Sequence, residues 1–285
     1  MIFLLLAMIS SASMALVLKC FRRQQGNRYG ILLGNYLTCI LISFLLLPQK
    51  SIILHGSRIS WICGVIAGVF FVVALVCMQS SIRRNGATLT TAFARLGLIV
   101  SLAVSILHFH DRPSAIQLIG IALALIAILV LRPASAKTDS KRVSGFGFGL
   151  LLLTLLASGG ADVMAKVFEQ YGSDQENSLY FFYLFLTSAL ICACLALRER
   201  LKSEKRIRVS EFSAGILVGI PNFYSSYLLL LALQKLPAFF TYPVYSTGTI
   251  LLVMLLSAFL FRERLSKKQL PGMLLILAAI VLLNL

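Results

Sequence analysis

The chain has 285 residues, of which 59% are hydrophobic and 13% are charged, and its formal net charge is +16. A mean hydropathy of +0.92 exceeds what a soluble core needs, so the composition excludes an ordinary soluble domain and indicates a membrane protein. The basic surplus could suggest a nucleic-acid partner, but its distribution along the chain, described below, argues against one.

Runs of about 20 apolar residues recur along the chain, as a hydrocarbon layer about 30 Å thick requires. Because every backbone polar group must be satisfied inside lipid, these runs predict transmembrane helices and an all-α integral membrane fold. Ten spans are expected, at 2–18, 31–47, 59–79, 87–107, 115–131, 147–166, 179–197, 212–233, 238–261 and 269–285. No basic start precedes the first run, so a cleavable signal peptide is not expected. The six cysteines lie in or at the ends of spans, which favours packing over disulfides or metal binding.

The end of the chain repeats its middle. Residues 108–131 (HFHDRPSAIQLIGIALALIAILVL) align without a gap with residues 260–283 (LFRERLSKKQLPGMLLILAAIVLL), and 11 of the 24 positions are identical at an offset of 152. The shared F-x-x-R-x-S-x-x-Q-L-x-G skeleton is more specific than the matching Leu and Ala residues. We therefore expect a first five-helix repeat at 1–132 and a second at 147–285, joined by a polar cytoplasmic linker at 133–146.

Basic residues are distributed unevenly between the loops. Loops that follow odd-numbered spans carry 20 Lys and Arg residues, whereas loops that follow even-numbered spans carry five. Because the basic surplus marks the cytoplasmic side, both termini are expected outside. An odd number of spans in each repeat means that the two copies cross the membrane in opposite directions. Matching loops have opposite charge preference, which predicts an inverted repeat.

The closing stretch contains a glutamate, a short polar turn and a glycine before its last apolar run. The residues of this pattern are Glu263, Leu265, Ser266, Gln269 and Gly272, and the first half retains Asp111, Ser114, Gln117 and Gly120. The pattern resembles the last helix pair of EamA-type transporters in the drug/metabolite transporter superfamily. This resemblance implies ten helices in two inverted repeats and carriage of a small metabolite across the cytoplasmic membrane. Family members usually keep both termini in the cytoplasm, so the loop charges depart from the family on this point.

Charged residues inside the predicted spans are candidates for a functional site. Arg95 lies roughly 14 Å into a core about 30 Å thick, near its middle. Asp162 is the only carboxylate clearly within a span, and Lys166 follows one turn later on the same face. Because such charges are costly, they should face a partner or a water-filled cavity. Arg95 is expected to bind an anionic group of the substrate and Asp162 to carry a coupling proton; the alternative is an ion pair that neutralises both.

A second cluster surrounds Pro221 and Pro243, which interrupt the eighth and ninth spans and free backbone carbonyls. Polar and aromatic residues near these prolines complete the predicted substrate site: Asn222, Tyr224, Tyr242, Tyr245 and Thr247. At the offset of 152, Phe93 corresponds to Tyr245, so Phe93 is added to the site. Arg95 likewise corresponds to Thr247, and the fourth and ninth spans are expected to face each other.

Further motifs have structural interpretations. Helix packing is expected at two G-x-x-x-G motifs in matching positions of the third and eighth spans, formed by Gly64, Gly68, Gly215 and Gly219. Tyr180 and Tyr183 are expected in an interfacial aromatic belt. A surface turn is favoured over a zinc site at His108, His110 and Asp111, because no further ligand is near in sequence.

The pattern favours a secondary transporter, an exporter that moves a small polar metabolite such as an amino acid or organic anion by alternating access. A flippase of lipid-linked groups and a multidrug exporter are the alternatives. An enzyme is not expected, because no span contains histidine and no glycine-rich phosphate loop occurs. Neither cofactor nor metal is expected. The expected partners are a small-molecule substrate and the lipid bilayer, with the chain as a monomer or homodimer in the bacterial cytoplasmic membrane.

Overall fold

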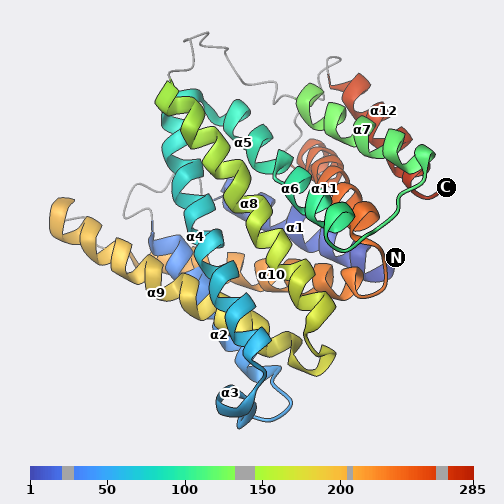
Figure 1. Ribbon diagram of the computed structural model, residues 1–285. Helices are drawn as coiled ribbons and strands as arrows, with labels where there is room; N and C mark the ends of the chain where they lie inside the picture. Colours follow the sequence, from blue (N-terminus) through green and yellow to red (C-terminus); the bar gives the residue numbers. More distant parts are fainter. Residues whose placement is uncertain (21–28, 132–144, 204–207, 261–268) are drawn as a thin grey trace. The chain divides into compact units, whose positions relative to one another are not determined.

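The computed structural model describes residues 1–20, 29–131, 145–203, 208–260 and 269–285 (Figure 1). The elements in chain order are α1 (Ile2–Cys20), α2 (Gly30–Leu45), α3 (Ile52–His55), α4 (Arg58–Asn85), α5 (Ala87–Leu96), α6 (Leu98–Leu107), α7 (Ala115–Val130), α8 (Gly145–Tyr171), the 3-10 turn η1 (Asp174–Glu176), α9 (Asn177–Ser203), α10 (Val209–Leu233), α11 (Ala238–Leu260) and α12 (Leu270–Leu283). Within these described ranges there is no strand, which agrees with the predicted all-α class.

Among the residues that the structure describes, six helical segments are long and apolar enough to cross a membrane. They are α4, the α5–α6 segment Leu89–Leu107, α8, η1 with α9, α10 and α11. Four shorter apolar helices, α1, α2, α7 and α12, coincide with the remaining predicted spans. The fourth predicted span is broken at Gly97, and the short helix α3 was not predicted. Several Ser and Thr hydroxyl groups inside the apolar helices donate to the backbone of their own helix: Ser43, for example, donates to the carbonyl oxygen of Cys39 at 2.7 Å.

The helices form two compact units, and each unit takes residues from both predicted repeats. Unit 1 comprises Met1–Val72 and Val167–Ala232, and unit 2 comprises Val73–Lys166 and Leu233–Leu285. The unit boundaries fall within α4, within α8 and before Leu233, the last residue of α10, so these helices contribute to both units. The predicted domain boundaries therefore separate the two sequence repeats, but they do not coincide with the boundaries of the compact units. Of the linker predicted at 133–146, residues 133–144 lie outside the described ranges, as do Glu263, Leu265 and Ser266.

Close helix crossings organise unit 1 at the four glycines of the G-x-x-x-G motifs. Gly64 and Gly68 of α4 face α9, where added Cβ atoms would lie 2.7 and 2.5 Å from backbone carbonyl oxygens of that helix. Gly215 of α10 faces α2, where a Cβ would lie 2.4 Å from the carbonyl oxygen of Ile31. Gly219, one turn later, faces the same helix. At these distances no side chain fits, so the glycines let the helix backbones approach each other.

Helices α2 and α9, the second and seventh predicted spans, also contact each other in unit 1. The rings of Tyr36 and Phe185 lie 6.2 Å apart, and those of Phe44 and Phe182 lie 6.3 Å apart. As residue numbers rise along α2, they fall along α9. The two helices are therefore antiparallel.

Helices α7 and α12 form the corresponding antiparallel pair in unit 2, and they lie side by side in Figure 1. A Cβ on Gly120 of α7 would lie 3.0 Å from Cγ of Leu283, and a Cβ on Gly272 of α12 would lie 2.5 Å from Cγ of Leu131. The N-terminal part of each helix thus packs against the C-terminal end of the other. At the offset of 152, Gly120 matches Gly272 and Leu131 matches Leu283, so the two contacts are exchanged by the repeat.

The repeated skeleton has a local structural role as well. Ser114 begins α7 as its N-cap: its hydroxyl accepts from the backbone N–H of Gln117 at 3.2 Å. The side-chain oxygen of Gln117 accepts in return from the backbone N–H of Ser114 at 2.9 Å. This capping box satisfies two donors at the start of the helix. In the first repeat, the S-x-x-Q part of the skeleton is therefore a helix start signal.

The prediction of an interfacial belt is wrong for Tyr180. Its side chain is 1% exposed, and its ring stacks on Phe168 with centroids 4.5 Å apart. Tyr183 is half-buried, and its hydroxyl donates to the carbonyl oxygen of Ile53 at 2.6 Å. In a membrane protein both lipid and core are apolar, so the position of a tyrosine near a span end does not reveal which of the two it faces.

Candidate functional site

The candidate site in unit 2 is built on a close crossing between the α5–α6 segment and α8. A Cβ on Gly159 of α8 would lie 2.3 Å from the carbonyl oxygen of Gly97, at the break between α5 and α6. Beside this contact, the hydroxyl of Ser158 donates to the carbonyl oxygen of Ala94 at 3.0 Å. Two glycines and a serine thereby hold the broken helix against α8.

This crossing brings together the two charged residues that the sequence indicated. Arg95 precedes Gly97 by two residues, and Asp162 follows Gly159 by three. Arg95 is close enough to interact electrostatically with the carboxyl group of Asp162. Both side chains are half-buried, so they retain some access to their surroundings. A positive and a negative group therefore lie together inside two apolar segments.

Helix α11 supplies a third member of the site. Tyr242 is 2% exposed, and its hydroxyl donates to the main-chain oxygen of Asp162 at 2.6 Å. The bond fixes α8 to α11 at the residue whose carboxyl group interacts electrostatically with Arg95. Pro243, next in the chain, lies inside α11 and removes one intrahelical donor there.

One turn after Asp162, Lys166 is buried, with 6% of its surface exposed. Its ammonium group lies 5.6 Å from the ring centroid of Phe109, in the turn that follows α6. A cation over an aromatic face is stabilised by about 0.5–2 kcal/mol, depending on its desolvation. Lys166 thus contacts an aromatic ring of its own unit.

The other predicted members of unit 2 differ in surroundings. Phe93 is half-buried and meets Phe148 edge to face, with centroids 6.4 Å apart. Thr247 is fully buried, and its hydroxyl donates to the carbonyl oxygen of Pro243 at 2.6 Å. Tyr245 is half-buried. The hydroxyl of Thr247 therefore uses its proton in a hydrogen bond within its own helix.

Asn222 and Tyr224, by contrast, belong to unit 1. The side-chain amide of Asn222 donates to the side-chain oxygen of Asn35 at 3.1 Å, and both residues are buried. The thiol of Cys39 lies 3.5 Å from the same oxygen and donates to the carbonyl oxygen of Gly219 at 3.3 Å. This polar cluster joins α10 to α2 beside their close crossing. Tyr224 is 41% exposed and meets Phe223 edge to face.

Sequence reasoning missed the residues that assemble these groups. Gly97 and Gly159 form the close contact between the α5–α6 segment and α8, and Ser158 is their hydrogen-bonding neighbour. The sequence carries a signal for one of them, since the pair Gly159–Gly160 is rare inside an apolar helix without a packing role. Asn35 could also have been selected from the sequence, because it is a polar residue within the second predicted span.

The grouping of Arg95, Asp162 and Tyr242 has defined chemical capacities. A guanidinium group binds carboxylates with paired hydrogen bonds, whereas a carboxyl group in an apolar segment can take up and release a proton. Binding of an anion at the arginine would change the charge that the carboxyl group experiences. For metals, the described part of the chain holds no group of three His, Cys, Asp or Glu residues.

Comparison with known proteins identifies relatives of the whole chain. The model of the EamA-like transporter family matches residues 1–132 and again residues 145–285. A Haemophilus influenzae protein described as uncharacterized is 25% identical over 301 residues, which cover 97% of this chain and 95% of the relative. A solved structure described as the crystal structure of a protein has a TM-score of 0.72 at 14% identity, with 99% of this chain and 94% of that chain covered. At that identity, the structural likeness is one of fold.

Proposed function

Since the chain belongs to the EamA-like transporter family and is a multi-pass integral membrane protein, we propose that it exports a small polar metabolite by alternating access. The membrane is the bacterial cytoplasmic membrane, and the substrate is an amino acid or another organic anion. All ten apolar segments cross the bilayer, the six long ones and the four shorter ones alike. As a secondary transporter, the protein draws its energy from an ion gradient.

The observation that carries this proposal is the proximity of Arg95 and Asp162 in unit 2. Each charge inside an apolar segment is expensive, so a pair kept there serves either to bind and couple or to neutralise itself. In the transport cycle, Arg95 binds the substrate carboxylate with two hydrogen bonds. The substrate replaces Asp162 as the partner of the arginine and is released on the outer side of the membrane. There the carboxyl group takes up a proton, and release of this proton into the cytoplasm restores the original pair, so a proton enters as a substrate molecule leaves.

The contacts between equivalent helices support an inverted repeat. Gly120 packs against Leu283, and the equivalent contact joins Gly272 to Leu131. Equivalent helices that are antiparallel and exchange their contacts are expected from a twofold axis in the membrane plane. The pair α2 and α9 is antiparallel in the same way. Two oppositely oriented copies provide the two alternating conformations that such a transporter requires.

The orientation rests on the loop charges. The 20 basic residues of the odd loops favour a cytoplasmic location for these loops, which leaves both termini outside. The chain then binds its substrate from the cytoplasm near this basic surface, and a positive potential there attracts anions.

The test is a ligand screen by thermal unfolding of the purified protein in detergent. Amino acids, organic acids, quaternary amines, nucleosides and lipid-linked compounds are compared on wild type, Arg95→Ala and a control, Arg112→Ala, in an exposed loop of the same unit. A ligand present at 100 times its Kd stabilises the folded state by about 2.7 kcal/mol. The proposal predicts that a carboxylate compound stabilises wild type and Arg112→Ala but not Arg95→Ala.

Other outcomes would count against the proposal. If only cationic or lipid-linked compounds stabilise the protein, and equally in all three variants, Arg95 does not bind substrate. The multidrug exporter or the flippase would then be the better assignment.

A further inference from the structure

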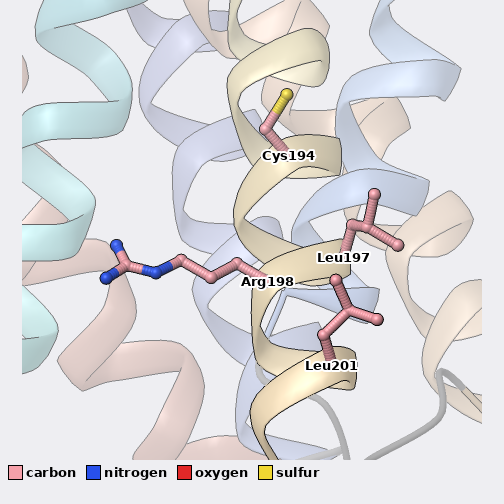
Figure 2. A pocket seen from close by; sticks show the side chains of 4 residues that line it. All are labelled: Cys194, Leu197, Arg198 and Leu201. Atoms are coloured by element: carbon pink, nitrogen blue, oxygen red, sulfur yellow. The ribbon is translucent and has the colours of Figure 1, made fainter.

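A surface cavity lies along the last turns of α9 in unit 1. Its volume is about 490 Å³, and it is lined by Cys194, Leu197, Arg198 and Leu201. With this spacing the four residues share one broad face of the helix. Figure 2 shows the guanidinium group of Arg198 extended to one side of α9, with Leu197 and Leu201 on the other. The cavity therefore has a charged flank and an apolar flank.

Both flanks are accessible. Leu197 is 56% exposed and Leu201 is 78% exposed, so an apolar surface is left uncovered. Arg198 is also exposed, and none of the residues that the structure describes forms a hydrogen bond or ion pair with it. The apolar segment that includes α9 ends at Leu201. Arg198 therefore lies roughly 4.5 Å before the end of the span, at the level where hydrocarbon gives way to lipid headgroups.

We propose that this cavity binds the headgroup of an anionic phospholipid of the phosphatidylglycerol type. Arg198 holds the phosphodiester with paired, charge-assisted hydrogen bonds, and an acyl chain packs against Leu197 and Leu201. The cavity is shallow and open along α9, so a phosphoglycerol headgroup can lie against it while the acyl chains remain in the bilayer.

Charge complementarity favours this occupant over a zwitterionic lipid. Residues 198–208 include six Lys and Arg but only two Glu, so the end of α9 begins a strongly basic stretch of sequence. Basic residues beside a span attract anionic lipids by about 1 kcal/mol each near the surface. The exposed leucines favour a lipid over a free anion, because a free anion would gain nothing from an apolar flank.

Cys194 provides a direct test, because its thiol is free and exposed while Cys39, Cys63, Cys77 and Cys192 are buried. Maleimide labelling of Cys194 is followed by intact mass spectrometry on the full chain in mixed micelles, in a Cys20→Ser background. Dioleoylphosphatidylglycerol is expected to slow the labelling, whereas dioleoylphosphatidylcholine is not. Arg198→Gln should raise the phosphatidylglycerol concentration needed for half-protection by about tenfold, since a hydrogen-bonded charged partner is lost.

Arg200→Gln is the matched control, because Arg200 is exposed on the same turn but points away from this face of α9. It should keep the wild-type protection, and Arg198→Lys, which retains the charge, should keep part of it. Thermal unfolding of each variant verifies that it is folded. Equal protection by the two lipids, or undiminished protection in Arg198→Gln, would overturn the proposal. Protection by inorganic phosphate alone would also overturn it, because the occupant would then be a free anion.

Discussion

The close crossing of α8 with the α5–α6 segment is the structural basis of the candidate site, and Gly159→Ala tests it. The added Cβ would lie 2.3 Å from the carbonyl oxygen of Gly97 and 2.7 Å from Cβ of Val100. An ordinary contact needs about 1 Å more, so the helices must separate by roughly that amount. Overpacking of this kind costs about 1–3 kcal/mol, partly offset by the gain of about 1 kcal/mol in helix propensity.

The functional effect should exceed the effect on stability. Arg95 and Asp162 lie two and three residues from the contacting glycines, so a separation of roughly 1 Å displaces them from each other. A misplacement of that size in a binding site can reduce activity by about 100-fold. We expect proteoliposome uptake of the compound identified in the ligand screen to fall by about tenfold to 100-fold. Thermal unfolding in detergent should show a net loss of no more than about 2 kcal/mol.

Gly149→Ala is the matched control within α8. No atom lies within 4 Å of the position that its Cβ would occupy, so the substitution adds helix propensity without a clash. The control should be at least as stable as wild type and should transport normally. If Gly159→Ala were as stable and as active as Gly149→Ala, the crossing would not position the site, and the reasoning would be refuted.

Three further predictions concern unit 1, the repeat and the orientation. Asn222→Ala should lower the free energy of unfolding in detergent by about 1 kcal/mol, because a buried amide loses its partner, while Tyr224→Phe at an exposed position should not. In a cysteine-free background, Gly120→Cys with Leu283→Cys should form a disulfide on mild oxidation, seen as a gel shift after proteolysis between the helices; no cross-link would contradict the antiparallel pairing. A tag after Leu285 should react with an impermeant reagent on intact cells, and labelling only after permeabilisation would reverse the proposed orientation.

Much of the helical layout could be predicted from the sequence because the physical requirement is strong. A bilayer demands apolar runs of a set length, and each of the ten predicted runs coincides with a described apolar helix. The same reasoning located charges and polar groups inside spans, including Arg95 and Asp162, because these residues are conspicuous in apolar surroundings. It could not identify their contacts, which depend on which helix faces which.

Which face of each helix packs against another helix was harder to predict from the sequence, for a physical reason. In water, an apolar face identifies the buried side of a helix, but in lipid both faces are apolar, so Tyr180 was assigned to the interface when it lies in the core. The place of Asn222 in the substrate site stays a prediction, and the sequence did not indicate that its amide is bonded to Asn35 within unit 1. Glycines at crossings are the better guide. The matching motifs that include Gly64 and Gly215 were interpreted as packing, and the structure shows close helix contacts at both.

The central claim is that Arg95 binds the substrate and Asp162 carries the coupling proton, and proteoliposome transport under an imposed pH gradient tests it most directly. Wild type, Arg95→Ala, Asp162→Asn and the Arg95→Ala/Asp162→Ala double variant are compared for gradient-driven uptake and for substrate exchange without a gradient. The account predicts that Arg95→Ala loses both activities, and that Asp162→Asn loses gradient-driven uptake while it retains exchange. Normal transport by the double variant would contradict the claim, because the two residues would then serve only to neutralise each other.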